Sequence, residues 1–233
     1  MVQAAFSNGA AEALLAGEML NDSWAEVARA PRDSLKTMNV AISRETGTHA
    51  TEIAHQVGAR LAWDVYDHEL LERMATQMDV RVNLLENIDE RCVNWLQEVT
   101  TVLANVPQVR ESQYVRQLVE TTIALGQTGN AVFVGRGAAW ILPPESTVRV
   151  ALMAPLEYRI VNVMHEREIS HKDAAAFVAE TDRHHARFAK AHFCREGIDP
   201  HAFDLVLNTS RLSLNDCVEL IVQGIHDRAR KLL

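Results

Sequence analysis

The sequence predicts an α/β protein in which a central parallel sheet of about five strands is covered by helices on both faces. Two observations lead to this class. Short apolar runs alternate with longer segments in which apolar residues recur at helical spacing. The segments between the runs are long enough for the helical crossovers that parallel strands need.

Residues 1–36 precede the first apolar run, and we expect them to form a helical appendage to one domain over residues 37–233. Within this appendage, the alanine- and leucine-rich segment 11–30 has a helical pattern that ends at Pro31. The helix either packs on the domain or forms the contact of a homodimer, and both alternatives stay open. Its apolar positions are Leu14, Leu15, Met19, Leu20, Trp24 and Val27.

The first unit of the domain has the order strand, loop, helix, strand. An apolar run over 39–43 predicts the first strand, and a second strand is expected near 62–66. The intervening helix is indicated by Ile53, Ala54, Val57 and Leu61, which share one face at helical spacing. Asp67 is well placed to cap the next helix, which begins at His68.

Helices dominate the next part of the chain, with patterns over 69–77, 80–102 and 112–126, and we expect Gly126 and Gly129 to stop the third. Strands are then predicted over 131–134 and 148–152, the latter leading into Pro155, a good first-turn residue. Helices over 156–167 and 171–192, a strand over 203–207 and a helix over 213–232 complete the pattern.

Composition excludes several classes of protein. The formal net charge of −8 argues against a general nucleic-acid binder, which usually carries a basic surplus. Cys92, Cys194 and Cys217 are widely spaced, which fits free thiols in a reducing compartment. Residues 1–20 have no lysine or arginine, so we expect no signal peptide, and no apolar run approaches the ~20 residues of a spanning helix. We therefore expect a cytoplasmic protein without nucleic-acid or membrane partners.

Polar residues follow four of the predicted strands. Ligands of open parallel sheets bind outside the carboxyl ends of the strands, and two of these ends contribute an arginine, so the simplest shared ligand is an anion. The alternative is that strand ends are turns, which are polar in any protein. The four ends are Ser43-Arg44-Glu45, Tyr66-Asp67, Gly135-Arg136-Gly137 and Asn208-Thr209-Ser210.

The loop after the first strand lies where phosphate-binding loops lie, because the helix that follows offers free N–H groups and a positive dipole end. The motif G-x-x-x-x-G-K-[ST] is nevertheless absent. Only Gly47 remains within 46–51, and no lysine follows. The alternative is an ordinary helix start with Thr48 as its N-cap.

A second basic group lies within residues 159–195. Arg183 and Arg187 are four residues apart and share a helix face, where a transferring phosphate would relieve their repulsion. Without a ligand, they fit a solvated face on which Glu180 and Asp182 offset the charge. The histidines form no tight set, so we expect no histidine metal site. The group also contains Arg159, Arg167 and Arg195.

Five phrases in order carry a resemblance to the cytidylate kinase-like family, over roughly residues 38–228. The resemblance implies a three-layer P-loop kinase fold with a helical insert at about 68–128 and an arginine-bearing lid at about 167–200. It also implies ATP with nucleotide-borne Mg²⁺ as cofactors, and small-molecule nucleotides as partners. The phrases are AISRETGTHATEIAHQVGARLAWDVYDHELLERMA (41–75), VFVGRGAAWIL (132–142), APLEYRIVNVMHERE (154–168), ETDRHHARF (180–188) and FDLVLNTSRL (203–212).

The resemblance also implies site residues. Asp67 and Arg136 match the positions that contact the acceptor nucleotide. The resemblance to the family's lid, with its pattern Asp-Arg-x-x-x-Arg, implies a catalytic group of four residues. They are Arg167, Asp182, Arg183 and Arg187. The donor phosphates would be held by the phosphate loop, namely Arg44, Gly47, Thr48, His49, Ala50, Thr51 and Glu52.

The phosphate loop departs from the family pattern. Related sequences usually read Phe-Gly-Ser-Gly-Gly-Arg-Glu over 46–52, but here His49 and Ala50 replace two glycines and Thr51 replaces the basic residue. Kinases of nucleoside monophosphates place a lysine near Ala50. Three functions therefore stay open. They are a kinase that transfers the ATP γ-phosphate to a nucleoside monophosphate such as CMP, a weak or inactive kinase fold that binds a nucleotide or phosphate ligand in a regulatory role, and a structural dimer that has lost its ligand.

Overall fold

The computed structural model describes residues 38–76, 113–195 and 197–231. Five strands form one parallel sheet in the order β2-β3-β1-β4-β5, as predicted. Central β1 pairs on both sides, with Ile42 in register with Val134 and Val150. The strands are β1 (Asn39–Arg44), β2 (Asp64–Tyr66), β3 (Ala131–Val134), β4 (Thr147–Met153) and β5 (Leu205–Asn208).

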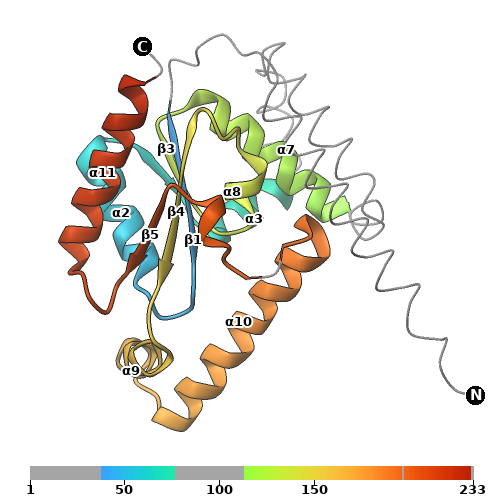
Figure 1. The fold of residues 1–233 in the computed structure, drawn as a ribbon. Helices are drawn as coiled ribbons and strands as arrows, with labels where there is room; N and C mark the ends of the chain where they lie inside the picture. The colour runs from blue at the N-terminus through green and yellow to red at the C-terminus, as the bar shows by residue number, and fades with distance from the viewer. Residues whose placement is uncertain (1–37, 77–112, 196, 232–233) are drawn as a thin grey trace, which may run out of the picture.

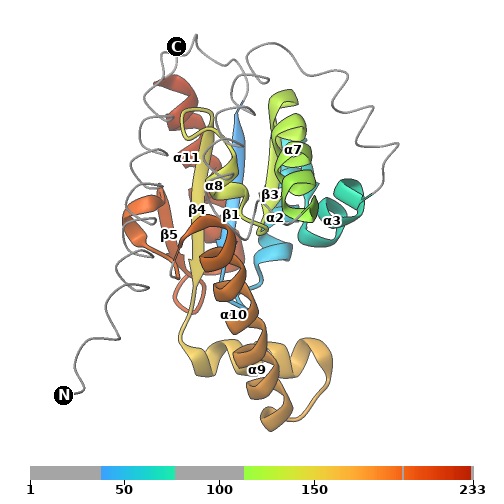
Figure 2. The same ribbon diagram turned by 90° about the vertical axis from the view of Figure 1, so that its right-hand side faces the viewer.

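Helices cover both faces of this sheet and make three layers (Figures 1 and 2). The alternation of side chains along β1 explains the arrangement, because Val40 and Ile42 face one apolar cluster and Ala41 faces another. The first cluster includes α2 (Ala50–Leu61) and α11 (Leu214–Arg230). The second includes α3 (His68–Thr76), α7 (Gln113–Thr128) and α8 (Ala138–Ile141).

Two further helices project from the carboxyl edge of the sheet, toward which the strand arrows of Figure 1 point. Helices α9 (Leu156–Arg167) and α10 (His171–Phe193) form an antiparallel hairpin around Ile160, Val163, Ala174 and Val178. Ser170 caps α10 by accepting a hydrogen bond from the Asp173 amide, and the short helix η1 (Pro200–Ala202) leads into β5. The hairpin therefore lies at the edge where ligands of such sheets bind.

Most predicted elements agree with the structure, and the differences have local causes. Gly126 does not end α7, which continues to Thr128. The glycine is needed for packing instead, because a Cβ there would lie 2.3 Å from Leu142 Cδ2. Asn39 Nδ2 also donates to the Gly126 carbonyl at 2.7 Å. The short helices α8 and η1 were not predicted. The appendage over 1–36 and the helix predicted over 80–102 lie outside the described residues.

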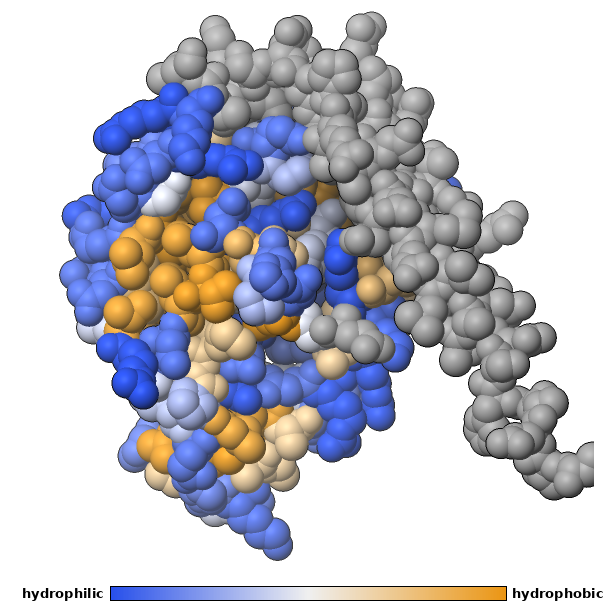
Figure 3. Space-filling model, in the orientation of Figure 1, coloured by the Kyte–Doolittle hydropathy of each residue, from blue (hydrophilic) through white to orange (hydrophobic). Residues whose placement is uncertain are grey.

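The surface is mixed in character. Figure 3 shows apolar surface over β5 and α11, where Val206 and Leu220 are exposed large apolar side chains. In the described parts of the chain, none of the helices has the length and apolar character needed to cross a membrane.

The packing of Gly126 predicts the effect of a substitution. Gly to Ala in a helix interior usually stabilises by about 0.5–1 kcal/mol, but here the new methyl group would overlap the fully buried Leu142. We expect Gly126→Ala to lower the free energy of unfolding by about 1–3 kcal/mol in urea denaturation. The matched control is Gly224→Ala in α11, where the nearest atom is 3.1 Å away and we expect no loss. Equal effects of the two variants would contradict this packing argument.

Candidate functional site

The loop between β1 and α2 turns through left-handed backbone at Gly47 and His49. Gly47 has a φ of +83°, and a Cβ at this position would lie 2.5 Å from the Arg159 carbonyl oxygen, so only glycine fits. His49 is the N-cap of α2 with a φ of 55°, and its side chain makes no capping hydrogen bond. The expected N-cap, Thr48, is wrong, because its hydroxyl donates to the Glu45 carbonyl at 2.8 Å instead. The first-turn amides of α2 therefore remain available to an anion.

The hairpin holds this loop from outside, through a pair that we call the Arg159–Asp182 clamp. Arg159 Nη1 donates to Asp182 Oδ2 at 2.6 Å and to the Thr46 carbonyl at 3.2 Å. Asp182 Oδ1 accepts from the Thr46 amide at 3.0 Å. Beside the clamp, Asn162 Nδ2 donates to the Gly47 carbonyl at 2.8 Å. Residues of α9 and α10 thus fix three polar backbone groups of the loop.

The clamp is an ionic network in a largely buried setting. Arg159 is only 7% exposed, and its Nε donates to the Ala154 carbonyl at 3.0 Å. Glu45 Oε2 lies 3.4 Å from the same Nε and accepts from the Ala154 amide at 3.0 Å. Burial alone would raise the pKa of Asp182, but the hydrogen bonds from Thr46 and Arg159 outweigh it and hold this pKa below its ordinary value. The carboxylate is therefore ionised in the folded protein at neutral pH.

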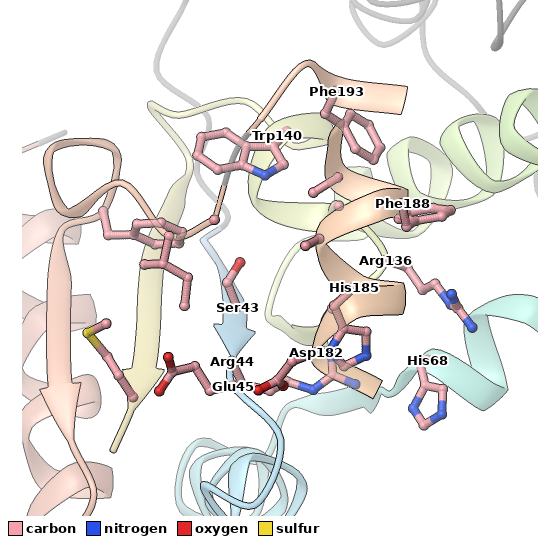
Figure 4. A pocket seen from close by; sticks show the side chains of 18 residues that line it. Ser43, Arg44, Glu45, His68, Arg136, Trp140, Asp182, His185, Phe188 and Phe193 are labelled. Atoms are coloured by element: carbon pink, nitrogen blue, oxygen red, sulfur yellow. The ribbon is translucent and has the colours of Figure 1, made fainter. Parts of the chain in front are cut away.

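A cavity of about 400 Å³ opens beside the loop, between the ends of β1 and β3 and helix α10 (Figure 4). The loops after β1 and β3 lead to helices on opposite faces of the sheet, which makes this the crevice where ligands of such sheets bind. The cavity is basic at one end and aromatic at the other, and its size suits a small molecule. Its basic side chains are Arg44, His68, Arg136 and His185, and its larger apolar ones are Trp140, Met153, Phe188, Phe193, Ile198 and Phe203.

Close approach of the strand ends shapes the basic end. A Cβ on Gly135 would lie 2.0 Å from Arg44 Nη1, so glycine is needed for the guanidinium to occupy this place. Burial, and then the neighbouring Arg136, lower the pKa of Arg44, while Asp67 opposes them. Arg136 also places its guanidinium carbon 5.5 Å from the centroid of the Phe188 ring. Two guanidinium groups that are held together in this way favour an anion between them.

Asp67 lies beside this basic end. Its Oδ1 accepts from the Leu70 amide at 2.8 Å, which confirms that it caps α3. The capped helix begins with His68, which lines the cavity. Asp67 therefore orients a cavity residue and also contributes negative charge near Arg44.

The arginines expected from the resemblance are not all brought together. Arg167, Arg183 and Arg187 are exposed and do not line the cavity. Arg167 instead lies over the Phe177 ring at 4.0 Å. A different set of α10 residues, which recur at helical spacing, forms the face that lines the cavity. That set is Asp182, His185, Ala186, Phe188, Ala189 and Phe193.

Sequence reasoning missed several lining residues. His185 could have been found by counting one turn on from Asp182, because residues three apart share a helix face. His68, Trp140 and Phe193 carried no comparable signal, since their meeting depends on how distant segments pack. Among the described residues, no three His, Cys, Asp or Glu side chains gather closely enough to hold a metal ion.

The fold and the loop define the class of this protein: it has a P-loop kinase fold, with a phosphate-loop position after the central strand and a cavity beside it. The chain belongs to the cytidylate kinase-like family, whose pattern matches residues 39–211. A solved structure of an uncharacterized protein from Eubacterium ventriosum supports the same fold, with a TM-score of 0.65 and 18% identity over 82% of this chain and 99% of that one.

Curated relatives carry the name cytidylate kinase. The protein from Pyrobaculum islandicum is 33% identical over 103 residues, which are 44% of this chain and 56% of the relative. The one from Pyrobaculum arsenaticum is 28% identical over 185 residues, 78% of this chain and 90% of the relative. In the first relatives, the chain thus spans only a little over half of their length.

The clamp predicts a pH-dependent contribution to stability. Arg159→Met and Asp182→Asn should each lower the free energy of unfolding by about 1.5–3 kcal/mol at neutral pH, because each leaves a charged hydrogen-bond partner unpaired. The pKa of Asp182 is lowered by folding, so its contribution is present above the unfolded value of about 3.9 and is lost as the pH falls through the folded value.

Denaturation of the wild type, both single variants and the double variant at several pH values measures this contribution. The double variant should cost clearly less than the sum of the single variants at neutral pH. Losses that are additive at neutral pH, or that stay the same as the pH falls from about 5 to below the unfolded value of about 3.9, would rule out an ionised and energetically coupled clamp.

Proposed function

We propose that the protein is a nucleotide kinase that transfers the γ-phosphoryl group of Mg-ATP to a nucleoside monophosphate such as CMP. One observation carries the proposal: a clamped loop that leads to an uncapped helix start lies at the same sheet edge as a basic, aromatic-walled cavity. Phosphoryl transfer needs little covalent chemistry from the protein, so positioning and charge suffice. Membership of the cytidylate kinase-like family supports this class of reaction.

The cavity suits the acceptor nucleotide. The resemblance assigns Arg44 to the donor phosphates, but Arg44 lines the cavity together with Arg136, and we assign both to the acceptor's phosphate instead. Guanidinium groups match phosphate oxygens with paired hydrogen bonds. Trp140 and Phe203, whose ring centroids are 5.6 Å apart, belong to the aromatic wall against which a base and sugar would pack. Asp67 would act by capping α3 and fixing the position of its first turn.

The donor phosphates would bind at the loop and the start of α2. The residues fit this ligand in shape, because the backbone of Gly47 and His49 turns as a phosphate loop requires and the first-turn amides have no side-chain cap. When bound, Mg²⁺ would arrive with the nucleotide and neutralise phosphate charge. The clamp would keep the loop preorganised, which lowers the cost of ordering it around the nucleotide.

A second candidate function is a kinase fold that binds a nucleotide or phosphate ligand with little or no turnover. The sequence of the loop favours this second candidate, because residues 44–52 contain no lysine. Arg159 contacts the loop but does not replace that lysine, since its guanidinium is buried and bonded to Thr46, Ala154 and Asp182. The two candidates make opposite predictions for turnover and the same prediction for binding.

The kinase proposal is tested by ADP release from Mg-ATP with CMP, dCMP, UMP, AMP and GMP as acceptors. We expect acceptor-dependent turnover, and Arg44→Gln should lower kcat/KM for the acceptor about 10- to 100-fold through loss of one charged contact. Arg230→Gln, an exposed arginine on α11 paired with Asp227, is the control and should behave as wild type. Nucleotide binding without turnover by the pure wild type would favour the second candidate, and absence of binding would contradict both.

The three exposed arginines need an experiment of their own. The resemblance assigns Arg167, Arg183 and Arg187 to the transferring group, but none of them lines the cavity. If Arg183 and Arg187 stabilise the transition state, the double variant Arg183→Ala/Arg187→Ala should lose kcat at least tenfold while the binding of CMP is kept. Unchanged kcat would place both arginines on a solvated helix face and remove them from the mechanism.

A further inference from the structure

The basic end of the cavity is built from four separate segments of the chain. Arg44 comes from β1, Arg136 from the loop after β3, His68 from the start of α3, and His185 from α10. Figure 4 shows the ends of these side chains turned toward one shared space. Convergence of cationic and titratable groups from four segments is what a site for a phosphate requires.

Each of the two histidines has a buried ring nitrogen that makes no hydrogen bond within the described part of the protein. The Nδ1 atoms of His68 and His185 are shielded from solvent and have no hydrogen-bond partner among the described residues. Buried polar atoms are nearly always hydrogen-bonded, so unsatisfied ones in two side chains that line the same cavity point to a partner outside the described protein. The two side chains line the same cavity as Arg44 and Arg136, the arginines that the proposed function assigns to the acceptor phosphate.

Burial, and then the neighbouring arginines, keep both rings neutral at neutral pH when the site holds no ligand. Burial lowers the pKa of His185 to about 4, and Arg44, Arg136 and His68 add to the shift while Asp182 opposes it. Burial, Arg44 and Arg136 likewise lower the pKa of His68, against Asp67 and Glu69. The nearby carboxylates have other partners: Asp182 belongs to the clamp and Asp67 caps α3.

We propose that His68 and His185 are ligands of the acceptor's phosphate group, and that His185 binds it as an imidazolium, so that acceptor binding takes up a proton. The inference rests on the proposed function for the identity of the acceptor, but it concerns binding alone. A phosphate dianion beside His185 would offset the two guanidinium charges and favour the protonated ring. The phosphate oxygens would also accept the hydrogen bonds that the ring nitrogens lack.

The direction of the pH effect follows from linkage. Proton uptake occurs only between the low pKa of free His185 and the higher value that it acquires in the complex. Within that window, the affinity for the dianion rises as the pH falls, by up to about tenfold per pH unit for one proton. Above the window, the affinity no longer depends on this histidine. Since a phosphate monoester has its own second pKa near 6, the proton count is best measured at about pH 7, where the ligand is already mostly dianionic.

The test is isothermal titration calorimetry at about pH 7 in two buffers of different ionisation enthalpy, with CMP and with inorganic phosphate as probes. We expect on the order of 0.5 to 1 proton taken up per ligand by the wild type. His185→Asn should abolish most of this uptake and weaken binding about tenfold or more, and His68→Asn should weaken binding with a smaller change in proton count. His184→Asn is the matched control, because the adjacent, exposed His184 lies 3.9 Å from Glu180 and outside the cavity.

Nuclear magnetic resonance of the histidine rings gives an independent readout. The pKa of His185 should rise by about 3 units or more, to about 7, when phosphate or CMP is added, and the addition should not change the titration of His184. Ligand binding without proton uptake, uptake that survives His185→Asn, or failure of both probes to bind would each overturn the inference. Binding with proton uptake but no ADP release would support the inference and contradict the kinase proposal, so the two failures are distinguishable.

Discussion

The hydrogen bonds between Asp182, Arg159 and the backbone of Thr46 set the geometry of the whole sheet edge. They join the loop after β1 to α9 and α10 at one point, and Glu45 and Ala154 complete the network around the same guanidinium. A buried guanidinium is tolerated only where carboxylates and carbonyl oxygens surround it, because an uncompensated charge in this place would cost several kcal/mol. The same hydrogen bonds therefore fix both the position of the α9–α10 hairpin and the path of the loop.

Helix α10 also contributes residues to the second half of the site, the cavity. Asp182 holds the loop, and His185, one turn further along, lines the cavity that we propose for the acceptor. Any displacement of α10 would change the donor loop and the basic end of the cavity together. Helix α10 thus links the two sites that we propose for donor and acceptor, and any such coupling would be reciprocal by linkage. Through α10, binding at one proposed site would change the affinity at the other without a separate conformational switch.

The fold was largely predictable because its signals are local. Apolar runs and helical periodicity placed β1, β3, β4, α9 and α10 within a residue or two, whereas the four-residue helix α8 is too short to show periodicity. The site was less predictable, because its contacts are distant in sequence. Thr46 and Asp182 are separated by 136 positions and Thr46 and Arg159 by 113, and no local pattern reports such a pairing. Family resemblance located the loop and Arg136, but the orientation of α10 decides which of its polar residues reach the cavity.

The altered phosphate loop can be understood from the same contacts. Glycine is kept at position 47, where a Cβ would lie 2.5 Å from the Arg159 carbonyl, while His49 adopts a left-handed φ of 55° in place of a glycine. The loop therefore turns at Gly47 and His49 but lacks the basic residue that the family resemblance implies for position 51. Shape holds a ligand in the ground state as well as in the transition state, whereas a cation aimed at the transferring group acts mainly in the transition state. A loop altered in this way should retain nucleotide binding more fully than turnover, so the rate depends on whether another cation, from α10 or from Mg²⁺, reaches the transferring phosphate.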